Sequence, residues 1–162
     1  MFIDTHAHLN MKAFKDDADE VIRRTLDEDT WLINIGADFK TSRRALDYAN
    51  KYEKGVYAAV GLHPLHLYEF RAQTEDYDFT TRGEEFSYDA YEKLAEFEKV
   101  VAIGEIGLDY HHLDIGVDVE EIKRLQKEVF WQQLLLARRR RLPVIIHCRQ
   151  AHDDMLAILN EF

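Results

Sequence analysis

Two histidines two residues apart stand near the start of the chain, in the segment FIDTHAHLN. His6 and His8 follow Asp4 at the same spacing. Residues two apart in a β-strand point to the same face, so these three side chains are expected to share one face. Imidazole is a ligand for zinc, nickel, iron and related divalent ions. The pattern therefore predicts a metal site, with a pair of hydrogen-bonded core histidines as the alternative.

A single carboxylate lies inside the apolar run AIGEIGL. Glu105 stands between Gly104 and Gly107 in this run. Burying an unpaired carboxylate is costly, so Glu105 needs a partner, either a metal cation or an arginine in a structural ion pair. Glycines next to it would let backbone or a ligand approach closely.

A third polar group closes the apolar segment PVIIHCR. His147 is expected where this strand meets its loop, and Arg149 follows two residues later. Cys148 alternates to the opposite face and is interpreted as a packing residue, because nothing nearby would activate its thiol. Asp109 comes four residues after Glu105 and could line the same pocket. His111 and His112 are expected in the next loop and are not predicted to be ligands.

Five short apolar runs are the scaffold that would position these residues. Each is rich in β-branched or aromatic residues, as in strands buried on both faces of a parallel sheet. The runs are Phe2–Leu9, Trp31–Ala37, Val56–Leu62, Val100–Leu108 and Pro143–Cys148. The candidate ligands stand at or near the carboxyl ends of the first, fourth and fifth runs. In barrels of alternating strands and helices, that end carries the active site.

Helical patterns separate the apolar runs, which predicts an α/β fold. The patterns are Phe14–Leu26, a helix capped by Thr41 or Ser42 that reaches Tyr52, a helix capped by Ser87, a long helix from Asp118 to Ala137, and a last helix after Arg149. The acidic segment Tyr68–Phe86 has no clear periodicity and is predicted to be an extended loop.

Composition and charge narrow the class of protein. The chain has 162 residues, 46% of them hydrophobic, which suits one domain, and its single cysteine fits a reducing, cytoplasmic setting. No signal peptide or membrane-spanning run is visible. The net charge of −10 argues against a broad nucleic-acid footprint, although bound cations can supply positive charge locally. The basic run Ala137–Arg141 is interpreted as the end of a helix, where cations complement the dipole.

Several motifs in this order resemble the TatD-like deoxyribonucleases, metal-dependent hydrolases with a TIM-barrel fold. The motifs are DTHAHL, VGLHP, GEIGLDY, PVIIHCR and AHDDMLAIL. The resemblance runs from the first strand to the end of the chain, except for Tyr68–Phe86, which is longer than is usual in the family.

The resemblance implies a role for each matching position. The positions are the metal ligands His6, His8, Glu105 and His147 and the substrate-binding candidates His63 and Arg149. Glu105 would be the catalytic carboxylate and would bridge two ions. His63, in GLHP, would lie near the substrate phosphate. Many members carry a second histidine directly after this proline. Here Leu65 takes that position and His66 follows it, so the role of His66 stays open.

The fold implied is a partial TIM barrel with five of the eight strand–helix units. A complete barrel takes about 250 residues, and the family's pattern continues with a further His and an Asp that these 162 residues lack. The expectation is one C-terminally truncated hydrolase domain over residues 1–162. Its first and fifth strands would be open edges, so a homodimer or a second polypeptide would complete the barrel.

The implied function is hydrolysis of phosphodiester bonds in DNA by water that two divalent ions, zinc, magnesium or manganese, activate. Two alternatives stay open. The chain could be a catalytically inactive partial barrel that binds metal or serves as an interaction module. It could also keep the metal site and hydrolyse an amide or an ester.

Overall fold

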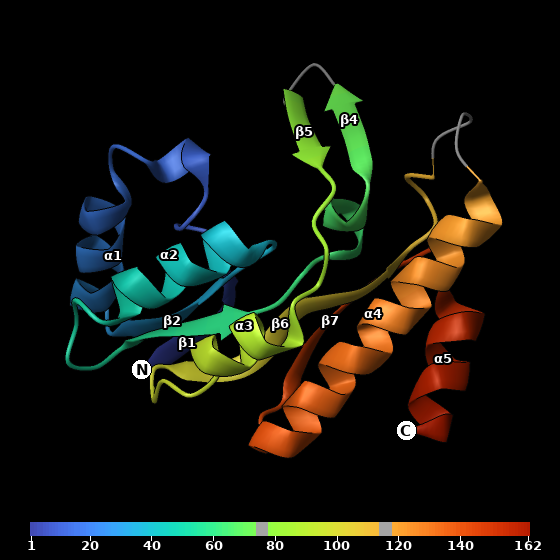
Figure 1. The fold of residues 1–162 in the computed structure, drawn as a ribbon. Coiled ribbons are helices and arrows are strands. Elements are labelled where there is room, and N and C mark those ends of the chain that lie inside the picture. Colours follow the sequence, from blue (N-terminus) through green and yellow to red (C-terminus); the bar gives the residue numbers. More distant parts are fainter. Residues whose placement is uncertain (74–77, 114–117) are drawn as a thin grey trace.

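The computed structural model describes residues 1–73, 78–113 and 118–162 (Figure 1). Its strands are β1 (Phe2–Ala7), β2 (Thr30–Ile35), β3 (Val56–Val60), β4 (Glu69–Gln73), β5 (Asp78–Arg82), β6 (Val100–Asp109) and β7 (Val144–Arg149). Its α-helices are α1 (Ala18–Asp27), α2 (Phe39–Ala49), α3 (Tyr88–Leu94), α4 (Val119–Arg140) and α5 (His152–Glu161). Two 3₁₀ turns, η1 (Lys12–Phe14) and η2 (Pro64–Leu67), follow β1 and β3. No helix among the described residues is long and apolar enough to cross a bilayer.

Five strands form one parallel sheet in the order β1-β2-β3-β6-β7. This is the order of the five predicted strands along the chain. The sheet curls, and α2, α3 and α4 cover one of its faces, with α5 beside α4 (Figure 1). Parallel strands joined through helices on one face make half of a (β/α) barrel. The predicted α/β fold and partial TIM barrel are therefore confirmed.

Alternation along the strands divides the apolar residues between the two faces of the sheet. Leu32 and Ala58 belong to the large core that the helices cover, whereas their neighbours Ile33 and Ala59 belong to a small cluster with Ile35. Strands with apolar side chains on both faces are expected inside a barrel wall.

The two edges of the sheet are β1 and β7, as predicted. In β1, the side chains of Phe2 and Ile3 are 75% and 52% exposed. Large exposed apolar side chains at an unpaired strand favour pairing with further backbone.

Residues 68–86 differ from the predicted extended loop, because they contain an antiparallel hairpin of β4 and β5. The prediction was wrong here because the hairpin stands away from the main sheet (Figure 1). Its strands therefore lack the continuous apolar runs by which the strands of the main sheet were predicted. Its base is held by Glu84, whose carboxylate accepts hydrogen bonds from the Phe39 backbone N at 3.2 Å and the Tyr91 hydroxyl at 2.8 Å. Residues 74–77 of the segment lie outside the described residues.

Capping residues determine where helices α4 and α2 begin. Helix α4 begins after Asp118 as predicted, and the Asp118 side chain accepts from the Glu120 and Glu121 amides at 3.2 Å. Helix α2 begins earlier than predicted, because Asp38 and Thr41 form a capping box.

Gly107 allows β6 and β7 to approach each other next to the candidate ligands. It pairs with His147, and its φ of +145° is one that residues with a side chain rarely adopt. A Cβ at this position would overlap the carbonyl oxygen of His147. Only glycine therefore fits here without moving β7.

We expect Gly107→Ala to lower the free energy of unfolding by about 1–3 kcal/mol, measured by urea denaturation. The matched control is Gly83→Ala at the base of the hairpin. Its φ is +70°, and the nearest atoms to an added Cβ lie at 3.6 Å. The control has the backbone strain without the overlap, so it should lose less. Equal losses in the two variants would show that the close approach of the strands is unimportant.

Candidate metal centre

Glu105 lies inside the half-barrel, where four imidazoles surround its carboxylate. The last paired residues of β3 and β6 are Val60 and Ile103. Two residues later, the Glu105 backbone N donates to the carbonyl oxygen of Gly36, at the end of β2, at 3.0 Å. The backbone of β6 therefore crosses towards β2 at this point, and the Glu105 side chain, 13% exposed, reaches the centre of the site.

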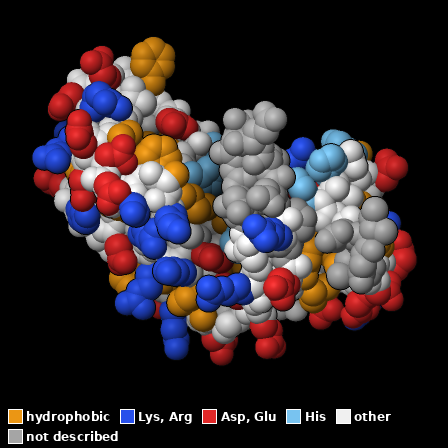
Figure 2. Space-filling model, turned by 90° about the horizontal axis from the view of Figure 1, so that it is seen from above, with side chains coloured by type: hydrophobic (Ala, Val, Ile, Leu, Met, Phe, Trp, Pro, Cys, Tyr) orange, Lys and Arg blue, Asp and Glu red, His pale blue; other side chains and the backbone are white. Residues whose placement is uncertain are grey.

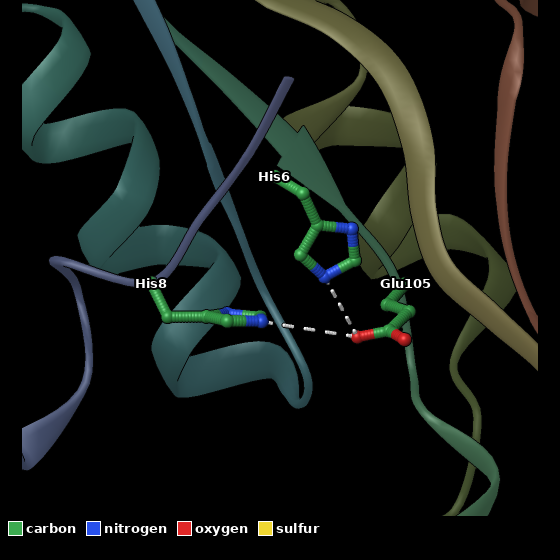
Figure 3. A group of neighbouring side chains, drawn as sticks. All are labelled: His6, His8 and Glu105. Atoms are coloured by element: carbon green, nitrogen blue, oxygen red, sulfur yellow. Dashed lines mark ion pairs between the residues drawn. The ribbon is translucent and has the colours of Figure 1, made fainter. Parts of the chain in front are cut away.

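His6 and His8 face one oxygen of Glu105 from the first strand. Figure 3 shows both imidazoles pointing toward the carboxylate, with His6 Nε2 at 3.5 Å and His8 Nε2 at 4.0 Å from Glu105 Oε2. His8 Nδ1 lies 3.1 Å from the carbonyl oxygen of Ile35. A carbonyl can only accept, so Nδ1 carries the proton and Nε2 is free to coordinate. Asp4 does not join this group, because its Oδ1 accepts from the His6 backbone N.

His147 faces the other oxygen of Glu105 from β7. Its Nδ1 lies 3.1 Å from Glu105 Oε1, and its Nε2 lies 2.9 Å from Asp109 Oδ2. Asp109 is fully buried and also accepts from His112 Nδ1 at 2.9 Å. A carboxylate behind an imidazole holds the ring and its tautomer, a common arrangement at metal sites.

His63 approaches from the end of β3, but its hydrogen bonds suit donation rather than coordination. Its Nε2 lies 4.0 Å from Glu105 Oε1, and its ring centroid is 4.2 Å from that of His147. Its Nδ1 accepts from the Leu65 backbone N at 3.2 Å, so the neutral ring carries its proton on Nε2. Burial, and then the charge of His147, lower the pKa of His63 from 6.5 to about 3, so the ring is neutral.

The remaining charges in the cluster are paired. Burial raises the pKa of Glu105, but the hydrogen bond with His147 and the nearby imidazoles outweigh burial and lower the pKa to about 2. Burial lowers the pKa of His147, but its hydrogen bonds with Asp109 and Glu105 outweigh burial and raise the pKa to about 9. Without a metal, His147 is therefore an imidazolium between two carboxylates.

The donor atoms suit divalent metals. Two sets have donor atoms within 4.8 Å of one another, His6 with His8 and Glu105, and His63 with Glu105 and His147. Two ligands bound tetrahedrally at about 2.0–2.1 Å to one zinc ion are roughly 3.4 Å apart. The separations of 3.1 to 4.0 Å about Glu105 are close to this value. Since Glu105 belongs to both sets, its two oxygens could each hold a separate ion.

Arg149 and His66 lie outside this group. Arg149 ends β7 in register with Asp109, and its side chain is exposed. Among the described residues, no contact joins its guanidinium to the cluster. His66 Nδ1 lies 3.7 Å from an oxygen of Asp38, and its ring centroid is 6.4 Å from that of His63.

Two buried glutamines of α4 support the strand ends, and sequence reasoning missed them. Gln126 accepts from the Asp109 backbone N at 2.9 Å and donates to its carbonyl oxygen at 3.0 Å. Gln133 makes the same pair of bonds with Leu62, at 2.8 and 3.0 Å. The signal was present, because two amides seven residues apart lie on one face of a helix. The roles of Asp109 and His112 behind His147 were also missed, because they depend on contacts between strands.

Comparisons with known proteins agree with this geometry. Residues 3–162 match the family model described as TatD related DNase. The chain is 39% identical over 162 residues to an uncharacterized metal-dependent hydrolase, YabD, of Bacillus subtilis, and it covers 99% of this chain and 56% of that protein. It is 34% identical over 157 residues to the 3'-5' ssDNA/RNA exonuclease TatD of a Pantoea strain, covering 96% and 53%.

A solved structure gives the same result. The crystal structure of YJJV, a TatD homologue from Escherichia coli, superposes with a TM-score of 0.74 at 32% identity, covering 99% of this chain and 55% of that one. The chain thus spans about half the length of the curated relatives it matches.

We expect the metal-free protein to lose stability as pH rises from 7 through 9. His147 has a folded pKa of about 9, against about 6.5 in an unfolded chain. Its contribution is complete below 6.5 and is lost as the folded state releases the proton. Urea denaturation in EDTA at several pH values measures this. His147→Gln should reduce the decline, whereas a control at exposed His152, His152→Gln, should keep it. An equal decline in both variants would contradict the assignment.

Proposed function

This chain belongs to the TatD-related DNase family, and we propose that it takes part in hydrolysing phosphodiester bonds, with divalent metals held around Glu105. The observation that carries the proposal is the Glu105 carboxylate, with imidazole nitrogens from three strands or their ends 3.1 to 4.0 Å from its oxygens. Nuclease relatives named for single-stranded DNA and RNA support nucleic acid as the substrate class, and we propose DNA for this chain.

Each residue of the cluster has a role in this proposal. His6 and His8 would hold one ion, and His147 would hold the other while Asp109 fixes the imidazole of His147. Glu105, which belongs to both candidate sets, would contribute to both ions. Its low pKa keeps the carboxylate ionised and ready to bind at neutral pH. Zinc, magnesium and manganese are all candidates, since imidazole and carboxylate are mixed in this donor set.

In this proposal, the metal ions and the protein side chains have different roles in the reaction. When bound, the ions supply Lewis-acid polarisation of the phosphoryl group and activation of a water molecule. His63 remains neutral next to them and presents its Nε2–H to a phosphate oxygen, so it orients the substrate. Arg149, exposed at the end of β7, contacts a neighbouring phosphate with a guanidinium suited to phosphate oxygens.

The open edges support a further part of the proposal. Residues 1–162 form part of a (β/α) barrel, and further strands pair with β1 and β7 to complete it, a second copy or another polypeptide being one source of them. The exposed apolar side chains of β1 favour this arrangement. A metal-binding or interaction module without catalysis is the alternative that the same edges suggest, and the nuclease assay below separates the two. A cytoplasmic location is part of the proposal as well.

We expect Glu105→Gln to reduce cleavage of a labelled single-stranded DNA oligonucleotide by about 100-fold or more, because metal stabilisation of the transition state is worth several kcal/mol. The assay adds Mg²⁺, Mn²⁺ or Zn²⁺, with an RNA oligonucleotide in parallel. The control is Glu128→Gln, at an exposed carboxylate of α4 that pairs with Arg124 at 3.5 Å. Equal activity in the wild type and Glu105→Gln would refute the catalytic claim. Bound metal without cleavage would favour the module.

We expect Asp109→Asn to weaken metal binding about 10–100-fold, because Asp109 holds His147 in position. Competition with a fluorescent chelator measures the affinity without using activity, and circular dichroism checks that the variant folds. The control is Asp153→Asn on α5, at an exposed carboxylate. Unchanged affinity in a folded Asp109→Asn protein would show that Asp109 does not support the metal ligand.

A further inference from the structure

A pocket of about 410 Å³ is lined by four cations and one aromatic ring. The lining residues are Lys12, Lys15, Lys40, Arg44 and Tyr48. Lys12 and Lys15 lie in and directly after η1, which follows β1, and the other three belong to α2, which follows β2. Lys12, Lys15 and Lys40 therefore lie near the carboxyl ends of the first two strands, the end from which His8 projects, and the pocket continues along α2 through Arg44 to Tyr48. We call it the basic pocket.

Positive charge in the basic pocket is only partly neutralised, although the chain has a net charge of −10. Lys15 pairs with Asp16 at 3.6 Å. Within residues 1–73, 78–113 and 118–162, no ion pair with a carboxylate is found for Lys12, Lys40 or Arg44. Figure 2 shows Lys and Arg side chains gathered over the part of the molecule that carries α2.

The other basic region of the chain is different. At the end of α4, Arg139 pairs with Glu92 at 2.8 Å and Arg140 with Glu96 at 3.6 Å, both from α3. The bounds of α4, which ends at Arg140, confirm that the arginine run is the end of a helix. The basic pocket differs from this run because three of its cations have no carboxylate partner among the described residues.

Hydrogen bonds join the basic pocket to the metal centre. Arg44 Nη1 donates to the carbonyl oxygen of Asn10 at 2.9 Å, which fixes the guanidinium. The buried Asn10 side chain donates to the carbonyl oxygen of Ile35 at 2.9 Å. The same oxygen lies 3.1 Å from His8 Nδ1. Arg44 therefore contacts Asn10, which lies two residues along the chain from His8, a proposed metal ligand.

We propose that the basic pocket binds the backbone phosphates of a single-stranded nucleic acid whose reacting bond lies at the metal centre. The inference rests on the proposed function and adds to it the path of the substrate. Lysine and arginine neutralise phosphates, and aromatic rings provide stacking surfaces for bases of single strands. Tyr48 provides such a ring, with Lys51 Nζ 4.5 Å from its centroid. The local cluster explains how an acidic chain holds a polyanion.

The test measures binding of a fluorescein-labelled oligonucleotide of twelve thymidines to EDTA-treated protein, by anisotropy across a range of salt concentrations. The variant is Lys12→Gln with Lys40→Gln, which leaves the anchored Arg44 in place. The control is Lys54→Gln with Lys93→Gln, two exposed lysines at the opposite end of the sheet with the same change of charge. Each phosphate contact on a single strand contributes about 0.7 to the slope of log affinity against log salt.

We expect the basic-pocket variant to bind about tenfold more weakly at 0.1 M salt and its slope to be smaller by about 1.4, while the control retains the wild-type slope. Equal slopes in the two variants, or no binding by the wild type, would overturn the proposal. Because no metal is present, binding is measured separately from hydrolysis. Pocket-dependent binding by a chain that, when loaded with metal, cleaves no phosphodiester would support the basic pocket and refute the proposed function.

Discussion

The half-barrel is organised around the largely buried Glu105 carboxylate and the imidazoles that compensate for it. Glu105 would be costly to bury alone, and it is stable here because four histidines from different parts of the chain face its oxygens. Without metal, the compensation comes from the imidazolium of His147. With metal, it would come from the ions themselves. Replacement of the His147 proton by a metal ion next to this carboxylate would link the stability of the fold to its proposed chemistry.

The rest of the scaffold keeps these groups at the right separation. Gly107 lets β7 come close enough for His147 to reach Glu105. Gln126 and Gln133 tie the ends of β6 and β3 to α4 through the backbone, so the positions of Asp109 and His63 do not depend on flexible loops. Buried amide hydrogen bonds and one close contact between strands thus fix the positions of the candidate metal-binding side chains, because each restricts the movement of the backbone next to them.

The net charge of the chain does not show where its positive charges are concentrated. The chain is acidic as a whole, and the arginines at the end of α4 pair with glutamates of α3. The basic pocket differs because three of its cations have no carboxylate partner among the described residues, and it adjoins the strand end that carries His8. Electrostatic attraction to phosphates acts over short distances in salt, so under our proposal this local group of cations, and not the net charge, would guide a nucleic-acid backbone.

The sequence alone determined the strand–helix order, the two edge strands and the metal-ligand candidates. The strand–helix order and the histidine pair of the first strand follow from local patterns, namely short apolar runs, helical periodicity and alternate positions of one strand, whereas the edge strands and the full ligand set follow from the family resemblance. It did not reveal the hairpin of residues 69–82, because these two short strands pair with each other and lack the continuous apolar runs that mark the strands of the main sheet. It also missed Asp109 behind His147, the glutamine ties of α4 and the basic pocket. Each of these depends on which residues the fold brings together from distant positions, and only the tertiary structure decides that.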